Sequence, residues 1–200
     1  MTQKCITSFR RYSCITGLSL LLASCVSFGA KAPPTLLVLT ASSGVQNGAA
    51  QSGSPADALI ILQPEVPQKI STNRIPVQID VSNIAYLKNA LWADKPARMM
   101  QNLLMETISA KTGRLVLNEV DAGGKAQQFL SGSLMEFGID SSAMEAIVVY
   151  DAVKMVRGQV VQKKRFEARE ALTAIEPGPA GASLNRAANK IAGEIAAWVG

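Results

Sequence analysis

Histidine is absent from the 200 residues of this chain, and aromatic residues make up only 5% of them. The lack of histidine removes the commonest general base, the Ser-His and Cys-His nucleophile pairs, and most zinc and iron sites. The chain also lacks a glycine-rich phosphate loop, a nucleophile elbow and a zincin motif, and its carboxylates are scattered. We therefore predict a protein that is not an enzyme and that holds neither a metal nor a cofactor.

Cysteine is also scarce, and all three cysteines lie within the first 25 residues. Basic residues come first, and an apolar run over residues 14–24 follows them. This run has the length of a signal-peptide core and is too short to span a bilayer, which takes roughly 20 residues. It leads into Leu22-Ala23-Ser24-Cys25, which resembles a bacterial lipobox. We predict a lipoprotein signal peptide over residues 1–24.

The lipobox resemblance implies that a signal peptidase cuts before Cys25, which then carries acyl chains. Several chains on one residue give stable membrane attachment, because each buried CH₂ contributes about 0.8 kcal/mol. Cys5 and Cys14 would leave with the leader, so no thiol would remain for a disulfide. Val26 stands where an aspartate retains many Gram-negative lipoproteins in the inner membrane, which favours a periplasm-facing anchor in the outer membrane. The alternative is an ordinary secretory signal with a cysteine there by chance.

The positive charge of the chain is concentrated in the leader. The formal net charge is +5, from 20 basic and 15 acidic residues. Lys4, Arg10 and Arg11 precede Cys25 and no acid does, so the mature chain keeps 17 basic residues against 15 acids, a net charge of +2. This balance gives no reason to expect nucleic-acid binding.

After a tether over residues 25–34, the hydrophobic pattern predicts one domain over residues 35–200. We expect strands at 35–41, 58–64, 74–82, 114–120, 126–139, 144–156 and 160–170. The first of these reads as a buried strand, and the small polar run 42–56 reads as a flexible loop. In the fifth, alternation places five residues on one face: Phe129, Ser131, Ser133, Met135 and Phe137. A turn at 157–159 joins the last two strands into a hairpin, whose second strand carries charge typical of a solvated edge.

Helical spacing predicts a helix over 95–112, with Asp94 as its N-cap and Gly113 as its stop. Its three methionines fit core packing better than a soft-metal site. After a loop over 175–181, a final helix carries one apolar stripe that we expect to cover the sheet. The fold class is therefore α/β of the α+β type: a mixed, largely antiparallel sheet with two main helices packed on one face.

The segment 84–96 is neither a clean strand nor a clean helix. It combines two aromatic residues with long aliphatic ones, a composition common at interfaces and lipid-facing grooves. We predict a partner or lipid contact formed by Tyr86, Leu87, Leu91 and Trp92. The alternative is that the two aromatic residues close the end of the core beneath the first helix.

The order of several short motifs resembles the ABC-type transport auxiliary lipoproteins. These are the lipobox, LQPEVP (62–67), RIPV (74–77), AYLKNALWADKPA (85–97), RFEARE (165–170) and NRAANKIAGEIAAWV (185–199). The resemblance covers residues 35–199, with 42–56 as an apparent insertion. Only Cys25 maps as a functional position.

The resemblance implies an auxiliary component of a transporter that pairs an ATPase and a permease with a mammalian-cell-entry (MCE) domain protein. Such systems move lipids across the envelope, so the expected partners are those three proteins, the membrane and phospholipid. One alternative is a structural or assembly lipoprotein of the outer membrane unrelated to lipid transport. Another is a lone lipid carrier with an internal cavity.

Overall fold

The computed structural model describes residues 34–159 and 161–200 of the chain. The expected leader over residues 1–24 and the predicted lipidation site Cys25 lie outside these described residues, as does most of the expected tether. From Pro34 to Gly200 the chain forms one unit. Neither helix in this described part is long and apolar enough to cross a membrane.

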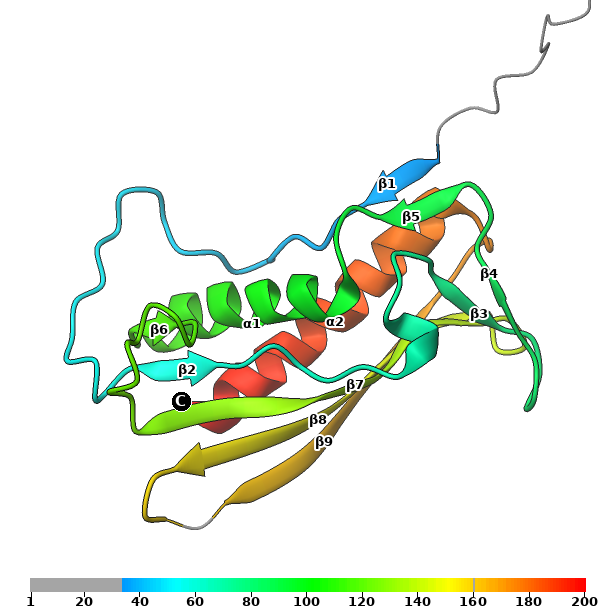
Figure 1. The fold of residues 1–200 in the computed structure, drawn as a ribbon. Helices are drawn as coiled ribbons and strands as arrows, with labels where there is room; N and C mark the ends of the chain where they lie inside the picture. Colours follow the sequence, from blue (N-terminus) through cyan, green and yellow to red (C-terminus); the bar gives the residue numbers. More distant parts are fainter. Residues whose placement is uncertain (1–33, 160) are drawn as a thin grey trace, which may run out of the picture. The chain divides into compact units, whose positions relative to one another are not determined.

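Three long antiparallel strands form one side of the sheet (Figure 1). They are β7 (Gln128–Asp140), β8 (Glu145–Val156) and β9 (Gln162–Ala171). The predicted hairpin between β8 and β9 is confirmed, and its turn uses Gly158 at a φ of 75°, a conformation that costs glycine little. Among the described strands β9 pairs only with β8, so its row of cationic side chains lies on a sheet edge.

A β-bulge in β7 overturns the predicted single face of that strand. The register with β8 shifts between Leu134 and Glu136, which leaves Met135 as the extra residue. The buried side chains are Leu130 and Leu134 before the bulge and Phe137 and Ile139 after it. One inserted residue moves every later side chain to the opposite face, so the expected alternation from Phe129 to Phe137 is wrong.

Short strands complete the sheet on the other side of β7. Both β2 (Leu59–Ile61) and β3 (Pro76–Gln78) run parallel to β7, one beside each half of it. Beyond them lie β6 (Val116–Leu117), parallel to β2, and β4 (Ile84–Tyr86), antiparallel to β3. The sheet is therefore mixed, and its longest pairings are antiparallel, as the sequence predicted.

Four of the expected strands are much shorter than their hydrophobic runs, since β2 takes three residues of the run 58–64 and β6 takes two residues of the run 114–120. The run 35–41 contains only β1 (Thr35–Leu37), which pairs in parallel with β5 (Ala90–Trp92) in a separate two-stranded sheet. Leu37 is its one buried residue, so the expectation of a buried strand is wrong. The run 74–82 stops being a strand after Gln78, because the chain turns back there into β4. A short 3-10 helix, η1 (Gln68–Ile70), lies between β2 and β3.

Two helices, α1 (Pro96–Thr112) and α2 (Pro177–Val199), cover one face of the sheet. Gly113 ends α1 in the left-handed conformation, as predicted, but the N-cap is Lys95 and not Asp94. The predicted loop over 175–181 is wrong from Pro177 onward. Proline is tolerated in the first turn of a helix, where its missing N–H has no intrahelical acceptor, so α2 begins there.

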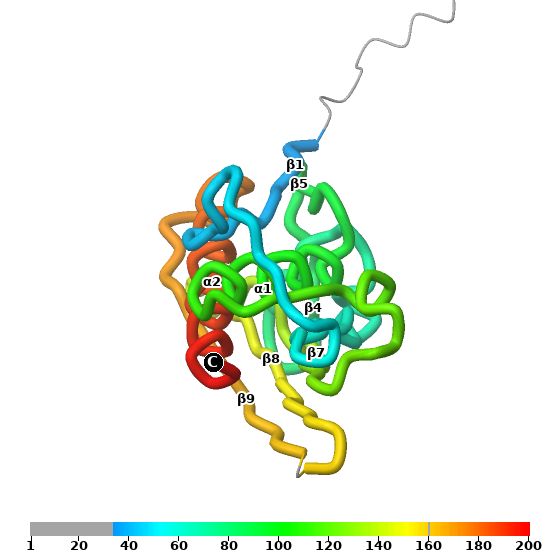
Figure 2. Tube along the Cα trace, turned by 90° about the vertical axis from the view of Figure 1, so that its left-hand side faces the viewer, coloured from blue at the N-terminus to red at the C-terminus, as the bar shows by residue number. Residues whose placement is uncertain are grey.

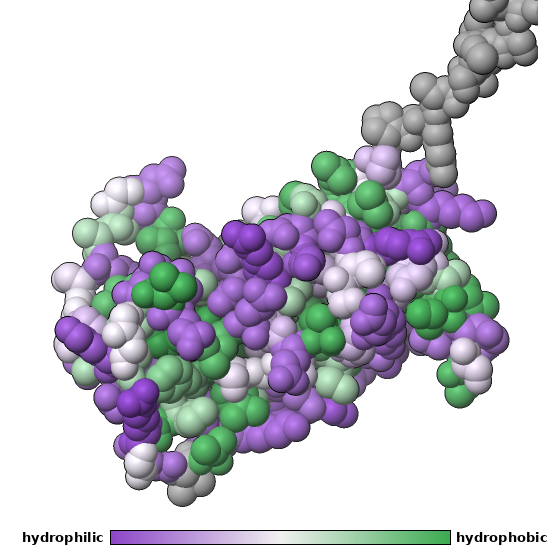
Figure 3. Space-filling model, viewed as in Figure 1, coloured by the Kyte–Doolittle hydropathy of each residue, from purple (hydrophilic) through white to green (hydrophobic). Residues whose placement is uncertain are grey.

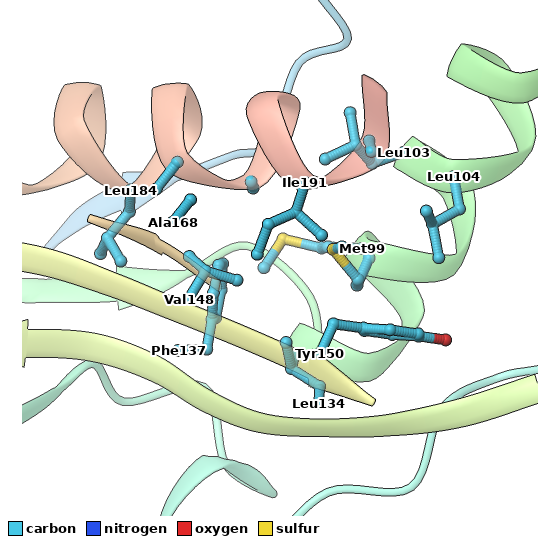
Figure 4. Close-up of a cluster of buried hydrophobic side chains, with 14 of the residues drawn as sticks. Met99, Leu103, Leu104, Leu134, Phe137, Val148, Tyr150, Ala168, Leu184 and Ile191 are labelled. Atoms are coloured by element: carbon cyan, nitrogen blue, oxygen red, sulfur yellow. The ribbon is translucent and has the colours of Figure 1, made fainter. Parts of the chain in front are cut away.

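The core fills the space between the helices and the sheet. Ile191 of α2 points toward Phe137 and Val148 of the sheet, and Leu103 and Leu104 of α1 belong to the same buried cluster (Figure 4). Gly132 lets the Tyr150 ring lie flat on β7, because a Cβ at residue 132 would come within 2.7 Å of that ring. Burial also raises the pKa of Tyr150, which keeps its hydroxyl neutral.

Residues 38–57, here called the strap, cross the outer side of the helix pair (Figure 2). The strap contains no helix or strand, as expected for a loop, yet side chains of both helices hold its backbone. Asn189 of α2 accepts a hydrogen bond from the Ser42 N–H at 2.7 Å and donates one to the Thr40 carbonyl at 2.9 Å. Glu106 of α1 accepts from the Val45 N–H at 2.8 Å. The loop expected over residues 42–56 is therefore present, and hydrogen bonds to its backbone tie it to both helices.

Candidate functional site

The predicted contact segment forms two short strands that belong to different sheets. β4 pairs with β3 in the large sheet, and β5 pairs with β1 in the small one. Asn89 turns the chain between them with a φ of 56°, and its carbonyl accepts a hydrogen bond from the Thr35 N–H at 2.8 Å. The segment therefore links the start of the described chain to the edge of the main sheet.

Two of the four predicted contact residues lie in the core. Trp92 is 1% exposed, and its ring stacks on Phe137 with 4.8 Å between ring centroids. Its backbone N–H donates to the Asn73 carbonyl, and the Asn73 side chain donates to the Trp92 carbonyl at 3.0 Å. Leu87 is buried as well. Neither of these two side chains reaches the surface. Their placement fits the alternative interpretation, in which this segment closes the end of the core.

The other two predicted residues, Tyr86 and Leu91, are half-buried and keep part of their side chains at the surface. The Arg74 guanidinium lies over the Tyr86 ring at 3.9 Å from its centroid. Arg74 itself is exposed, so this cation–π pair presents both an aromatic ring and a positive charge to the outside. A partner that approaches this edge of the sheet meets that pair first.

The sequence analysis missed the exposed apolar residues beside this pair. Ile79 is 48% exposed, Val81 is fully exposed and Ile84 is 42% exposed, all within the β3–β4 hairpin. On β1, Leu36 is 62% exposed. The alternation of Val77, Ile79 and Val81 fits the strand expected at 74–82, yet of these three side chains only Val77 is buried.

The face of the sheet turned away from the helices carries ion pairs. Asp151 accepts two hydrogen bonds from the Arg165 guanidinium, at 2.6 and 2.8 Å, and Lys163 lies 3.5 Å from the same carboxylate. The hydrogen bonds from Arg165 hold the pKa of Asp151 below its usual value, against the desolvation that would raise it. Both oxygens of this carboxylate accept hydrogen bonds from Arg165, so Asp151 joins β8 to β9 across the sheet.

The described residues offer no group of three or more acidic or cysteine side chains that could hold a metal ion. Three of the surface hollows meet at Arg114, which donates to the Val199 carbonyl at 2.9 Å and to Gln128 Oε1 at 2.7 Å. Because α2 has no basic residue in its last turn, Arg114 supplies the positive charge that a helix C-terminus favours. These two hydrogen bonds hold Arg114 at the end of α2, and we assign no ligand to these hollows.

The family model described as "ABC-type transport auxiliary lipoprotein component" matches residues 39–196. No curated protein matches the chain. A solved structure of an uncharacterized protein has 18% identity and a TM-score of 0.65, and covers 76% of this chain and 97% of its own. A structure of a Xanthomonas campestris protein of the DUF330 family has 16% identity and a TM-score of 0.62, and covers 84% of this chain and 92% of its own. At these identities the two structures support the fold alone.

Proposed function

This chain belongs to the family of ABC-type transport auxiliary lipoprotein components, and on that premise we propose that it assists an MCE-type ABC transporter that moves lipids across the cell envelope. The observation that carries the proposal is the family match over residues 39–196, which includes both helices almost completely and the whole central sheet. A family of transport auxiliary components is not an enzyme class. The ion pairs of Asp151 with Arg165 and Lys163 fit a structural use of these charged side chains.

We propose that Cys25 anchors the protein, facing the periplasm, in the outer membrane. The support is the sequence Leu22-Ala23-Ser24-Cys25 behind a basic and apolar leader, together with Val26 after the cysteine. Incorporation of labelled palmitate in growing cells should occur in the wild-type chain and be lost in Cys25→Ala. Separation of the two membranes on a density gradient should place the labelled chain with the outer membrane. Labelled chain in the inner-membrane fraction would contradict that placement.

The proposed docking surface for the transporter is the edge formed by Tyr86, Leu91 and Arg74. Leu87 and Trp92 support this edge from the core, because they fix the two strands that carry it. In this role the auxiliary protein binds the periplasmic part of the transporter, with phospholipid passing between the partners. A core filled with apolar side chains favours docking over a carrier that encloses its own lipid (Figure 4).

Crosslinking in cells tests the proposed partner. A photo-reactive amino acid replaces Tyr86 in one variant and Val120 in a matched control, since Val120 is 87% exposed on the loop between β6 and β7. We expect the variant at 86 to capture the MCE-domain protein, the permease or the ATPase of an ABC transporter, and the control to capture none of them. Capture of components of another outer-membrane assembly machine would support the alternative of a structural or assembly lipoprotein.

A further inference from the structure

The β3–β4 hairpin exposes large apolar side chains that no other element of the described chain covers. Ile79, Val81 and Ile84 all lie at or next to its turn, and Val81 is fully exposed. Hydrophobic residues gather at this hairpin and near β1 in the space-filling view (Figure 3). Leu36 and Val38 form the apolar surface near β1. Single exposed apolar residues are common, but a group on one projecting hairpin marks an interaction site.

The turn at the tip of the hairpin satisfies its own polar groups. The Asp80 carboxylate accepts hydrogen bonds from the backbone N–H groups of Ser82 and Asn83 at 2.9 and 3.0 Å, and from the Asn83 side chain. The Ile79 N–H donates to the Asn83 carbonyl at 2.9 Å. These hydrogen bonds reduce the cost of moving the ionised Asp80 carboxylate out of water but do not remove it, so the turn can approach the polar headgroup region of a bilayer while the carboxylate stays hydrated.

The base of the hairpin carries the residue types that favour the headgroup region. Tyr86 ends β4, and the Arg74 guanidinium covers its ring. Tyrosine and arginine combine an apolar body with a polar or charged end, and such residues are enriched where a protein crosses from water to hydrocarbon. From tip to base the hairpin therefore changes from apolar residues to an aromatic and cationic pair.

The proposed anchor lies within reach of the same surface. Ten residue steps separate Cys25 from Thr35, so the tether spans at most roughly 35 Å. The Thr35 N–H is bonded to the Asn89 carbonyl, and five residue steps separate Asn89 from Ile84, a span of at most roughly 18 Å. Since the second span is shorter than the first, a chain held at the bilayer by Cys25 can place this hairpin on the same bilayer.

We propose that the β3–β4 hairpin places its apolar tip, centred on Val81, in the interface of the bilayer that anchors the chain. The occupant of this surface is a lipid bilayer, and the proposal rests on the anchoring part of the proposed function. The acyl chains then hold the protein to the membrane, and the hairpin orients it. Orientation by a second contact point would present the Tyr86 edge at a fixed height above the bilayer.

Depth-dependent fluorescence tests the contact. Val81→Cys and the matched control Val120→Cys are produced as full chains in cells, purified with their acyl chains, labelled with an environment-sensitive dye and reconstituted in protein-free vesicles. Both valines are almost fully exposed, at 100% and 87%, so neither change should disturb the fold. The wild-type chain, whose one remaining cysteine would be acylated, should take no label.

We expect a blue-shifted emission at position 81 and about threefold stronger quenching by brominated lipid there than at 120, as for a residue at the acyl boundary. Equal exposure of both labels to water would overturn the proposal. Protection at 81 only after addition of solubilised envelope proteins would also overturn it, in favour of a protein partner.

A second variant tests whether the contact with lipid is centred on Val81 or is a general property of the protein surface. A label at Ile79→Cys should lose its lipid quenching when combined with Val81→Asp and keep it when combined with Val120→Asp. Quenching that survives Val81→Asp would contradict a contact centred on Val81. The vesicles contain no transporter, so the lipid quenching measured here does not depend on whether Tyr86 crosslinks to one. A failure of the anchor itself would be recognised separately, by the absence of palmitate incorporation.

Discussion

The body of the fold and the end formed by β1, β3, β4 and β5 use apolar residues in opposite ways. In the body, α2 packs on β8 and β9, and α1 packs beside α2 and over β2 and β6; the large apolar side chains of this body are almost completely buried. At the other end the strands are three residues long, and Leu36 and Ile84 in these strands stay exposed, as do Ile79 and Val81 in the turn between β3 and β4. Short strands bury few side chains against a common partner, so apart from core residues such as Trp92 they leave apolar side chains free for binding.

The aromatic pair Trp92 and Tyr86 gives the largest expected contrast between the two environments. Trp92→Ala removes a core ring that stacks on Phe137 and should lower the free energy of unfolding by about 3–5 kcal/mol. Tyr86→Ala removes a half-buried ring and its pairing with Arg74, and should cost about 1 kcal/mol or less. Urea unfolding of the mature chain measures both values. Similar losses for the two variants would show that the Tyr86 ring is part of the core after all.

A change at Asp151 measures how much the ion pairs on the face of the sheet turned away from the helices contribute to stability. Asp151→Asn removes the partner of Arg165 and Lys163 and should lower the free energy of unfolding by about 1–2 kcal/mol near pH 7. The folded pKa of Asp151 is below its unfolded value of about 3.9, so its contribution is present above pH 4 and is lost as the pH falls further.

Unfolding curves of the wild type and Asp151→Asn between pH 3 and 7 check this sign, with the exposed Asp121→Asn as the control. The wild type should lose its advantage over Asp151→Asn as the pH drops, while Asp121→Asn should follow the wild type. An advantage that grows in acid would contradict the assignment.

The strap should show the smallest effect on stability. Asn189→Ala removes one acceptor and one donor for the strap backbone at a partly exposed site, so the expected loss is about 0.5–1 kcal/mol. Hydrogen exchange at Ser42 should quicken about tenfold or less, while exchange in β8 should be unchanged. Lys190→Ala, at the next and exposed position, serves as the control. Unchanged exchange at Ser42 in Asn189→Ala would mean that Asn185 and Glu106 suffice to hold the strap.

Local sequence signals predicted the parts of the fold that depend on neighbouring residues. The helical spacing before Gly113 located α1, and the turn at 157–159 located the β8–β9 hairpin. The apolar stripe with Ile191 and Ile195 identified the face of α2 that packs on the sheet. Capping was less well predicted, because Pro177 fits both a loop and the first turn of a helix.

The candidate site was only half predictable, because burial there depends on distant residues. Tyr86 and Trp92 lie six positions apart in one aromatic segment, and nothing local distinguishes them. Trp92 is buried because Phe137 and Asn73 meet it across other strands, whereas Tyr86 has only Arg74 over its ring. The exposure of Val81 likewise depends on where the chain turns back into β4.

The sequence by itself determined the lack of histidine chemistry, the two helices, the long hairpin and the lipobox pattern before Val26. Only the tertiary structure decided three features: the β-bulge at Met135, which reverses the buried and exposed positions after it, the attachment of the strap to Asn189, and the exposure of the apolar tip at Val81. Periodicity along the chain shows which side chains share a face, because backbone geometry sets that repeat. Whether such a face is buried depends on contacts between residues far apart in sequence, and those contacts exist only once the chain has folded.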